Sequence, residues 1–302
     1  MPGYLLLCPG QGGQHPEMLD FALATPQGRE TIEEASTAVG IDIAARVRAG
    51  EGLFEPVFAQ IGMVATALAS WRALEPHVPQ PEAVAGYSVG EVSSWGCAGS
   101  WTVTETMTLA STRARLMLAA SPPDCTMVAM TGVDAAAVER LRGPAVHVAI
   151  EVERDHWILA GTRAEVDRAA QALSGAGGTA HPVSVTVPSH TPLLEPAAAA
   201  LRSVIAAMGG LAPRWPVARG IDGQWLHRIE DAAEALSGAV CRPIRWRSAL
   251  QEAQERSLAV CLELPPGQAL TRMVLARGVR EARSIADFRT IEGAARWLER
   301  AA

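Results

Sequence analysis

Residues 86–90 read G-Y-S-V-G, which fits the G-x-S-x-G pattern of a nucleophile elbow. A short apolar segment at 83–86 precedes the serine, and a helical pattern at 92–97 follows it. Small residues on both sides would let a sharp strand-to-helix turn project Ser88 from a strained corner. The backbone N–H of Val89, at the start of the helix, could then stabilise the oxyanion of an acyl-transfer intermediate. The pattern favours an ester on Ser88 over the alternative, a structural serine in a glycine-rich turn.

A second glycine-rich loop, P-G-Q-G-G-Q at residues 9–14, follows an apolar segment at 4–8. Such a loop could cradle a phosphate, but it lacks the G-x-G-x-x-G spacing, and all 26 basic residues of the chain are arginine. The absence of lysine excludes a P-loop, Schiff-base chemistry and a Ser-Lys dyad. Close approach of the backbone to an acyl oxygen explains the glycines equally well.

The composition is that of a globular protein, with 49% hydrophobic and 19% charged residues among 302. A net charge of −6 argues against nucleic acid as a partner. The five cysteines are scattered and form no C-x-x-C pair, which is typical of a reducing compartment. We find neither a signal-peptide pattern nor an apolar stretch of about 18 residues or more. We therefore expect a cytoplasmic protein that has no membrane partner.

The elements that must position Ser88 indicate two units. Residues 125–188 predict a β-α-β-β-α-β order, which is that of a ferredoxin-like module. Residues 1–124 and 189–302 predict a larger α/β domain into which this module is inserted. The expected segments are strands at 126–130, 145–150, 156–160, 179–187, 216–218 and 258–264, and helices at 61–74, 104–120 (with Thr104 as N-cap), 134–141 and 163–173.

Six segments, in order along the chain, resemble the malonyl-CoA:acyl-carrier-protein transacylases. The family motifs are F-P-G-Q-G-S-Q, G-H-S-x-G-E, x-R-G-x-x-M, V-P-S-H-x-x-x-M, N-P-V-x-W and E-x-G-P-G. Their counterparts span most of the chain and lie at residues 8–14, 86–91, 112–117, 185–194, 241–246 and 263–267. The resemblance implies a large α/β-hydrolase-like domain with a parallel sheet and an inserted ferredoxin-like subdomain.

The resemblance also implies roles for individual residues. His190 matches the base of a Ser-His dyad, and the backbone carbonyl that orients this base falls at Ala239, where the family usually has an amide side chain. Arg113 matches the arginine that grips the free carboxylate of the malonyl group, a pairing suited to a planar guanidinium. Gln11 would supply its backbone N–H as the second oxyanion donor beside that of Val89.

The implied reaction has two half-reactions. Malonyl-CoA acylates Ser88 and coenzyme A leaves, after which the phosphopantetheine thiol of an acyl carrier protein takes the malonyl group. Ping-pong kinetics follow from this scheme. Malonyl-CoA is a substrate, and neither a permanently bound cofactor nor a metal is expected.

The sequence departs from the family motifs at Cys8, Gly13 and Tyr87, where the family has Phe, Ser and His, and at residues 150–156, which replace an Asn-rich stretch. The form G-Y-S-V-G-E looks like the transacylase (epsilon) subunit of malonate decarboxylase, whose carrier protein bears a phosphoribosyl-dephospho-CoA arm. We favour this branch. The alternatives are a fatty-acid or polyketide malonyl-CoA transacylase, a serine hydrolase such as a thioesterase, and a non-catalytic carrier-binding subunit.

Overall fold

The computed structural model describes residues 3–141, 143 and 145–302. Its larger sheet has the strand order β11-β10-β1-β2-β7-β8, and each neighbouring pair is parallel except β7 with β8. Strands β1, β2 and β10 are buried along their whole length, as expected for parallel strands covered on both faces. The strands are β1 (Tyr4–Cys8), β2 (Ala83–Gly86), β7 (Val217–Ala218), β8 (Trp225–Leu226), β10 (Val260–Glu263) and β11 (Glu281–Ser284).

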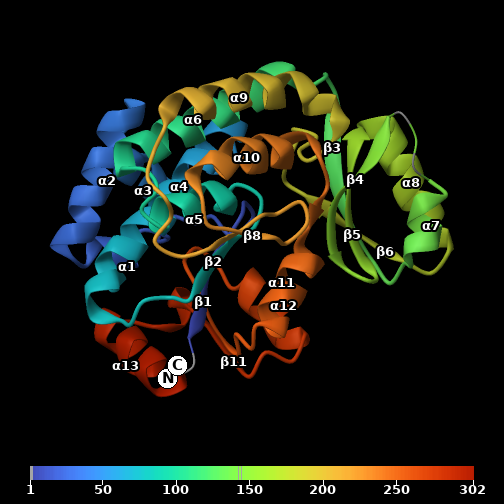
Figure 1. Cartoon of the computed structure of the whole chain (residues 1–302). Helices are drawn as coiled ribbons and strands as arrows, with labels where there is room; N and C mark the ends of the chain where they lie inside the picture. The colour runs from blue at the N-terminus through green and yellow to red at the C-terminus, as the bar shows by residue number, and fades with distance from the viewer. Residues whose placement is uncertain (1–2, 142, 144) are drawn as a thin grey trace.

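Helices cover this sheet (Figure 1). They are α1 (Asp20–Leu23), α2 (Pro26–Val39), α3 (Ile43–Ala49), α4 (Pro56–Leu74), α5 (Gly90–Cys97), α6 (Val103–Ala120), α9 (Glu195–Met208), α10 (Ala232–Cys241), α11 (Trp246–Glu255), α12 (Ala269–Ala276) and α13 (Ile291–Ala301), with 3₁₀ turns at Glu75–His77, Pro192–Leu194, Ile229–Asp231 and Ile285–Asp287. Along β1, Tyr4 and Leu6 face one apolar core, while Leu5 and Leu7 face another.

The smaller sheet has the order β6-β3-β5-β4-β9. Its elements are β3 (Cys125–Thr131), α7 (Ala135–Glu139), β4 (Val146–Glu153), β5 (His156–Thr162), α8 (Arg163–Gly175) and β6 (Thr179–Val183). Side chains alternate along β5, so that Ile158 and Ala160 join the core shared with β1, whereas Trp157 and Leu159 pack in a separate core with α8. This sheet lies beside the larger one in Figure 1.

The predicted fold class, a large α/β part with a smaller β-α-β-β-α-β part, is confirmed. The structure differs from the prediction in four strands, β6, β8, β9 and β11, the last three of which were not among the expected segments. β8 is antiparallel, because a short loop at 219–224 joins it to β7 and leaves no room for a crossover. β6 ends at Val183, and the smaller sheet gains β9 (Ile244–Arg245), which pairs parallel to β4 from outside the range 125–188. The domain boundaries themselves stay a prediction.

The start of α6 corrects a predicted cap. Thr102, not Thr104, is the N-cap: its hydroxyl accepts the N–H of Glu105, and the Glu105 carboxylate accepts the N–H of Thr102. Thr104 instead donates its backbone N–H and its hydroxyl to Glu34 of α2.

Helix α4 continues into the following turn, and together they form an apolar segment, Pro56–His77. Its 18-residue window has a mean hydropathy of 1.3, so by length and composition it could cross a membrane, contrary to the sequence-based expectation. Gln60, Thr66 and Ser70 interrupt the apolar run, which is why a search for continuous apolar residues missed it. In the structure 89% of that window is buried within the protein, as in the core helix of a globular fold.

Candidate active site

Ser88 lies in the turn that joins β2 to α5, with a φ of +57°, a region that residues other than glycine seldom adopt. The two flanking glycines make this turn possible. A Cβ at Gly86 would lie 2.2 Å from the carbonyl carbon of Gly90, and a Cβ at Gly90 would lie 2.1 Å from the carbonyl oxygen of Cys8. The G-x-S-x-G pattern therefore reflects close packing of the turn against itself and against the end of β1.

His190 lies 102 positions further along the chain, yet its Nε2 is 2.8 Å from Ser88 Oγ. Its φ is +64°, and its backbone N–H donates to the carbonyl of Val240 at 2.9 Å. Its Nδ1 donates to the carbonyl of Ala239. Both carbonyls belong to the last turn of α10, where helix carbonyls lack intrahelical partners. With Nδ1–H bound in this way, Nε2 is the acceptor for the Ser88 hydroxyl proton.

The pKa of His190 is lowered to about 3, first by burial and then by the positive charge of Arg113, while the Ala239 carbonyl acts in the opposite direction. The imidazole is therefore neutral at physiological pH and able to accept a proton. No Asp or Glu accepts a hydrogen bond from His190 in the part of the chain that the structure describes. The geometry thus pairs a serine hydroxyl with a histidine whose other nitrogen is bound by a backbone carbonyl, as the predicted dyad requires, and the catalytic role of the pair stays a prediction.

We predict that acylation of Ser88 stays nearly constant down to acidic pH. Between pH 7.5 and 5.5 its rate should change less than about twofold, whereas an imidazole with the ordinary pKa near 6.5 would lose about tenfold. Single-turnover acylation after brief pH jumps measures this. An acylation rate that halves near pH 6.5 would contradict the assignment.

The lowered pKa of His190 also affects stability. Below pH 6.5 the unfolded chain binds a proton at this histidine that the folded chain does not, so the free energy of unfolding falls as pH drops below that value.

Ser88 and His190 line a cavity of about 290 Å³. Gln11 lies in its wall, and the apolar face of the smaller sheet supplies further walls. Within residues 3–141, 143 and 145–302, the backbone N–H groups of Gln11 and Val89 donate to no protein acceptor. The Gln11 N–H thus remains free in the cavity wall, and that of Val89 is not taken up by another group, as the predicted oxyanion role requires. The lining residues from the smaller sheet and the chain after it are Met127, Ile150, Ile158, Val183 and Val185.

Tyr87 lines the same cavity, next to the nucleophile. Its ring meets that of Trp246 edge to face, with centroids 5.3 Å apart. Burial raises the pKa of the Tyr87 phenol, so the group is neutral. Trp246 therefore packs against Tyr87, which stands where the transacylase motif has histidine.

Arg113 does not line this cavity. Its side chain is 2% exposed on α6, where Nη1 donates to Gln60 Oε1. Gln60 in turn donates from Nε2 to the Met117 sulfur at 3.7 Å. Arg113 Nη2 has no hydrogen-bond partner among the described residues, although an unsatisfied buried donor is costly. Its charge still reaches His190, and its predicted carboxylate-binding role stays a prediction.

Glu91, in the first turn of α5, is fully buried. One carboxylate oxygen accepts the N–H of Gly220 at 3.2 Å, and the other has no partner in the described chain. Desolvation raises its pKa to about 8, opposed by the Gly220 hydrogen bond and the charges of Arg113 and Arg219. A largely neutral carboxyl group thus anchors the loop at 219–224 to the helix that follows Ser88.

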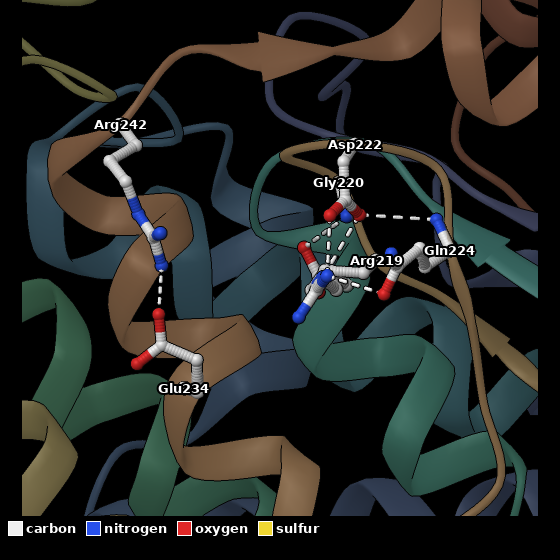
Figure 2. Close-up of polar contacts among 7 residues, drawn as sticks. Arg219, Gly220, Asp222, Gln224, Glu234 and Arg242 are labelled. Atoms are coloured by element: carbon white, nitrogen blue, oxygen red, sulfur yellow. Dashed lines mark hydrogen bonds and ion pairs between the residues drawn. The ribbon is translucent and has the colours of Figure 1, made fainter.

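The anchored loop is held by its own polar contacts. Figure 2 shows Arg219 bridging Asp222 and Gln224, with Nε 2.9 Å from Asp222 Oδ1. A separate pair in the same view, Arg242 with Glu234, joins the two ends of α10. The second pair spans the helix whose carbonyls orient the imidazole.

Sequence reasoning found Ser88, His190 and Ala239, which the structure brings together, and Gln11, which it places in the same cavity. Sequence reasoning did not assign a role to Gln60. The sequence nevertheless indicates one, because an amide side chain in an otherwise apolar helical run has to find a buried polar partner.

Comparisons with known proteins identify the family to which this chain is similar. Residues 5–296 match the sequence model of the acyl transferase domain. The chain is 30% identical over 282 residues to the Malonyl CoA-acyl carrier protein transacylase of Escherichia coli O157:H7, covering 90% of this chain and 91% of that one. The crystal structure of FabD from Acinetobacter baumannii superposes with a TM-score of 0.94 at 26% identity, over 100% of this chain and 99% of that one. A malonyl-transacylase in complex with a type II PKS acyl-carrier protein (PlMCAT:AntF, holo) superposes with a TM-score of 0.92 at 29% identity, over 97% and 99%.

Proposed function

The chain belongs to the acyl transferase family, together with the malonyl CoA-acyl carrier protein transacylases, and on that premise we propose that it carries a malonyl group from coenzyme A to an acyl carrier protein through an ester on Ser88. The observation that carries the proposal is the 2.8 Å contact between Ser88 Oγ and His190 Nε2 at the cavity wall. Relatives named for this reaction support the choice of substrate and partner.

The reaction follows from the two side chains. His190 Nε2 takes the hydroxyl proton while Ser88 Oγ attacks the thioester carbonyl, and the N–H groups of Gln11 and Val89 stabilise the resulting oxyanion. The C–S bond breaks, and the imidazolium returns its proton to the departing thiolate of coenzyme A. The carrier's thiol then gives its proton to His190 and attacks the ester carbonyl; the bond between that carbon and Ser88 Oγ breaks, and the imidazolium returns the proton to Oγ, which regenerates Ser88 and the neutral base. The scheme uses no bound cofactor.

The hydrolase alternative is tested by the fate of the acyl-enzyme. We expect label from radioactive malonyl-CoA to remain on Ser88 and to be released by a pantetheine thiol at least about 10²-fold faster than by water, since the mainly apolar cavity wall gives water few positions from which to attack. The measurement is the release rate of isolated, labelled protein with and without thiol. Release into water that equals release to the thiol would identify a thioesterase.

Two types of carrier protein could accept the malonyl group from Ser88. The similar proteins favour a carrier of the fatty-acid or polyketide type. The form G-Y-S-V-G-E, with Tyr87 beside the nucleophile, instead motivates a role as the transacylase subunit of a malonate decarboxylase system. The test offers both carriers at equal concentration to the labelled enzyme. The arm of the physiological carrier should take the label faster, which distinguishes the two roles.

We also propose a cytoplasmic location, which the unpaired state of all five cysteines supports.

A further inference from the structure

A groove of about 450 Å³ adjoins the active-site cavity and is formed by α12, β11 and α13. It shares Gln268 and Arg272 with the wall of the cavity that holds Ser88. In Figure 1 these three elements lie together in the orange and red part of the chain. Because the two hollows share wall residues, they lie side by side along α12.

Three arginines line this groove: Arg272, Arg280 and Arg283. All three are exposed, although the chain as a whole carries a net charge of −6. Arg272 and Arg283 form neither an ion pair nor a hydrogen bond within the described part of the chain, and Arg280 Nη2 donates to the carbonyl of Ala301 at 2.7 Å. Guanidinium groups that are gathered in one hollow without a carboxylate in an ion pair are suited to phosphate oxygens, which they bind through paired N–H donors.

Asp287, one of the acidic residues that line the groove, already accepts hydrogen bonds from its neighbours. Asp287 accepts Gln268 Nε2 with one oxygen at 2.6 Å and the Ser284 N–H with the other at 3.1 Å. Glu281 is the other carboxylate in the lining. The buried Glu263 accepts the first free N–H groups of α12, so the end of that helix is satisfied from within. The arginine side chains, not the helix terminus, therefore supply the attraction for an anion.

The groove also has an apolar surface. Leu275 is 45% exposed, and Trp297, which packs against Phe288 with ring centroids 5.8 Å apart, is half-buried beside it. An aromatic side chain beside cationic groups is a surface on which a base can stack while its phosphates are held.

We propose that this groove is a phosphate-binding subsite that holds the nucleotide end of the coenzyme A thioester while its acyl end reaches Ser88. The phosphates contact Arg272, Arg280 and Arg283, and the base lies against Trp297. The inference rests on the proposed function, since it needs a donor that reacts at Ser88. The phosphate of a carrier's phosphopantetheine arm offers the same chemistry at the same place, so the test includes both sources.

The test compares a donor that has phosphates with one that has none. For Arg283→Gln, we expect the KM for malonyl-CoA to rise about tenfold, because one charge-assisted contact is lost, while the KM for malonyl-pantetheine stays unchanged. Adenosine 3′,5′-bisphosphate should inhibit the wild type competitively against malonyl-CoA and inhibit Arg283→Gln about tenfold less. The matched control is Arg289→Gln, an exposed arginine outside the groove lining, which should behave as wild type.

A second arm measures release of the malonyl group from Ser88 to holo-carrier and to free pantetheine. If Arg283→Gln weakens only the carrier reaction, the subsite serves the carrier's phosphate, and the nucleotide assignment is wrong. If it affects neither phosphate-bearing partner, the subsite does not exist. In both cases labelling of Ser88 by malonyl-pantetheine would remain. Absence of that labelling in the wild type would instead overturn the proposed function itself.

Discussion

Replacement of Ser88 by alanine should abolish covalent labelling by malonyl-CoA and lower the rate of transfer by about 10⁴-fold or more, the scale seen when a serine nucleophile is removed. The reason is geometric. Among the residues that the structure describes, His190 Nε2 hydrogen-bonds only to this hydroxyl, at 2.8 Å, and an alanine leaves the base without a proton to accept. Incubation with radiolabelled malonyl-CoA, followed by denaturation and peptide mapping, measures the covalent step separately from turnover.

A second serine in the same cavity provides a matched control. Ser189 precedes His190, lines the cavity, and donates its hydroxyl to the Val187 carbonyl at 3.4 Å rather than to the imidazole. Ser189→Ala should therefore keep stoichiometric labelling at Ser88. Label retained by Ser88→Ala, or turnover equal to that of the wild type, would rule out the covalent mechanism and favour a non-catalytic, carrier-binding protein.

The sequence predicts those parts of the site that local backbone chemistry determines. The elbow could be identified because two glycines must allow close approach of the chain on either side of Ser88. The β-α-β-β-α-β order of the smaller part could be identified because its apolar residues alternate or repeat at the right periods. Two-residue strands such as β9 carry no periodic signal, and their pairing depends on tertiary contacts alone.

The distances between remote segments are harder to predict. The roles of His190 and Ala239 came from resemblance, and only the fold shows that the last turn of α10 presents its carbonyls to the imidazole. Neither the buried amide of Gln60 nor the carboxyl of Glu91 received a role from the sequence. Their contacts depend on tertiary packing, since Gln60 meets Arg113 across two helices and Glu91 meets a backbone N–H of a loop far along the chain.

Arg113→Ala should separate malonyl from acetyl transfer. Arg113 Nη2 is buried without a partner, and we expect the free carboxylate of a malonyl group to supply one. Loss of a buried charge pair of this kind costs about 3–5 kcal/mol, or about 200- to 5,000-fold in kcat/KM for malonyl-CoA. Acetyl-CoA has no carboxylate and should lose far less. Arg115→Ala, an exposed arginine on the same helix, should change neither rate.

The ratio of the two substrates makes this result independent of folding. Because Arg113 also donates a hydrogen bond to Gln60, its replacement can disturb α4 against α6 and reduce the fraction of active protein. That fraction scales the malonyl and acetyl rates of one preparation equally and cancels in their ratio. A ratio that falls by about 10²-fold therefore reports a lost carboxylate contact. A ratio that stays constant while both rates fall would mean that Arg113 serves only to pack Gln60 beneath the site.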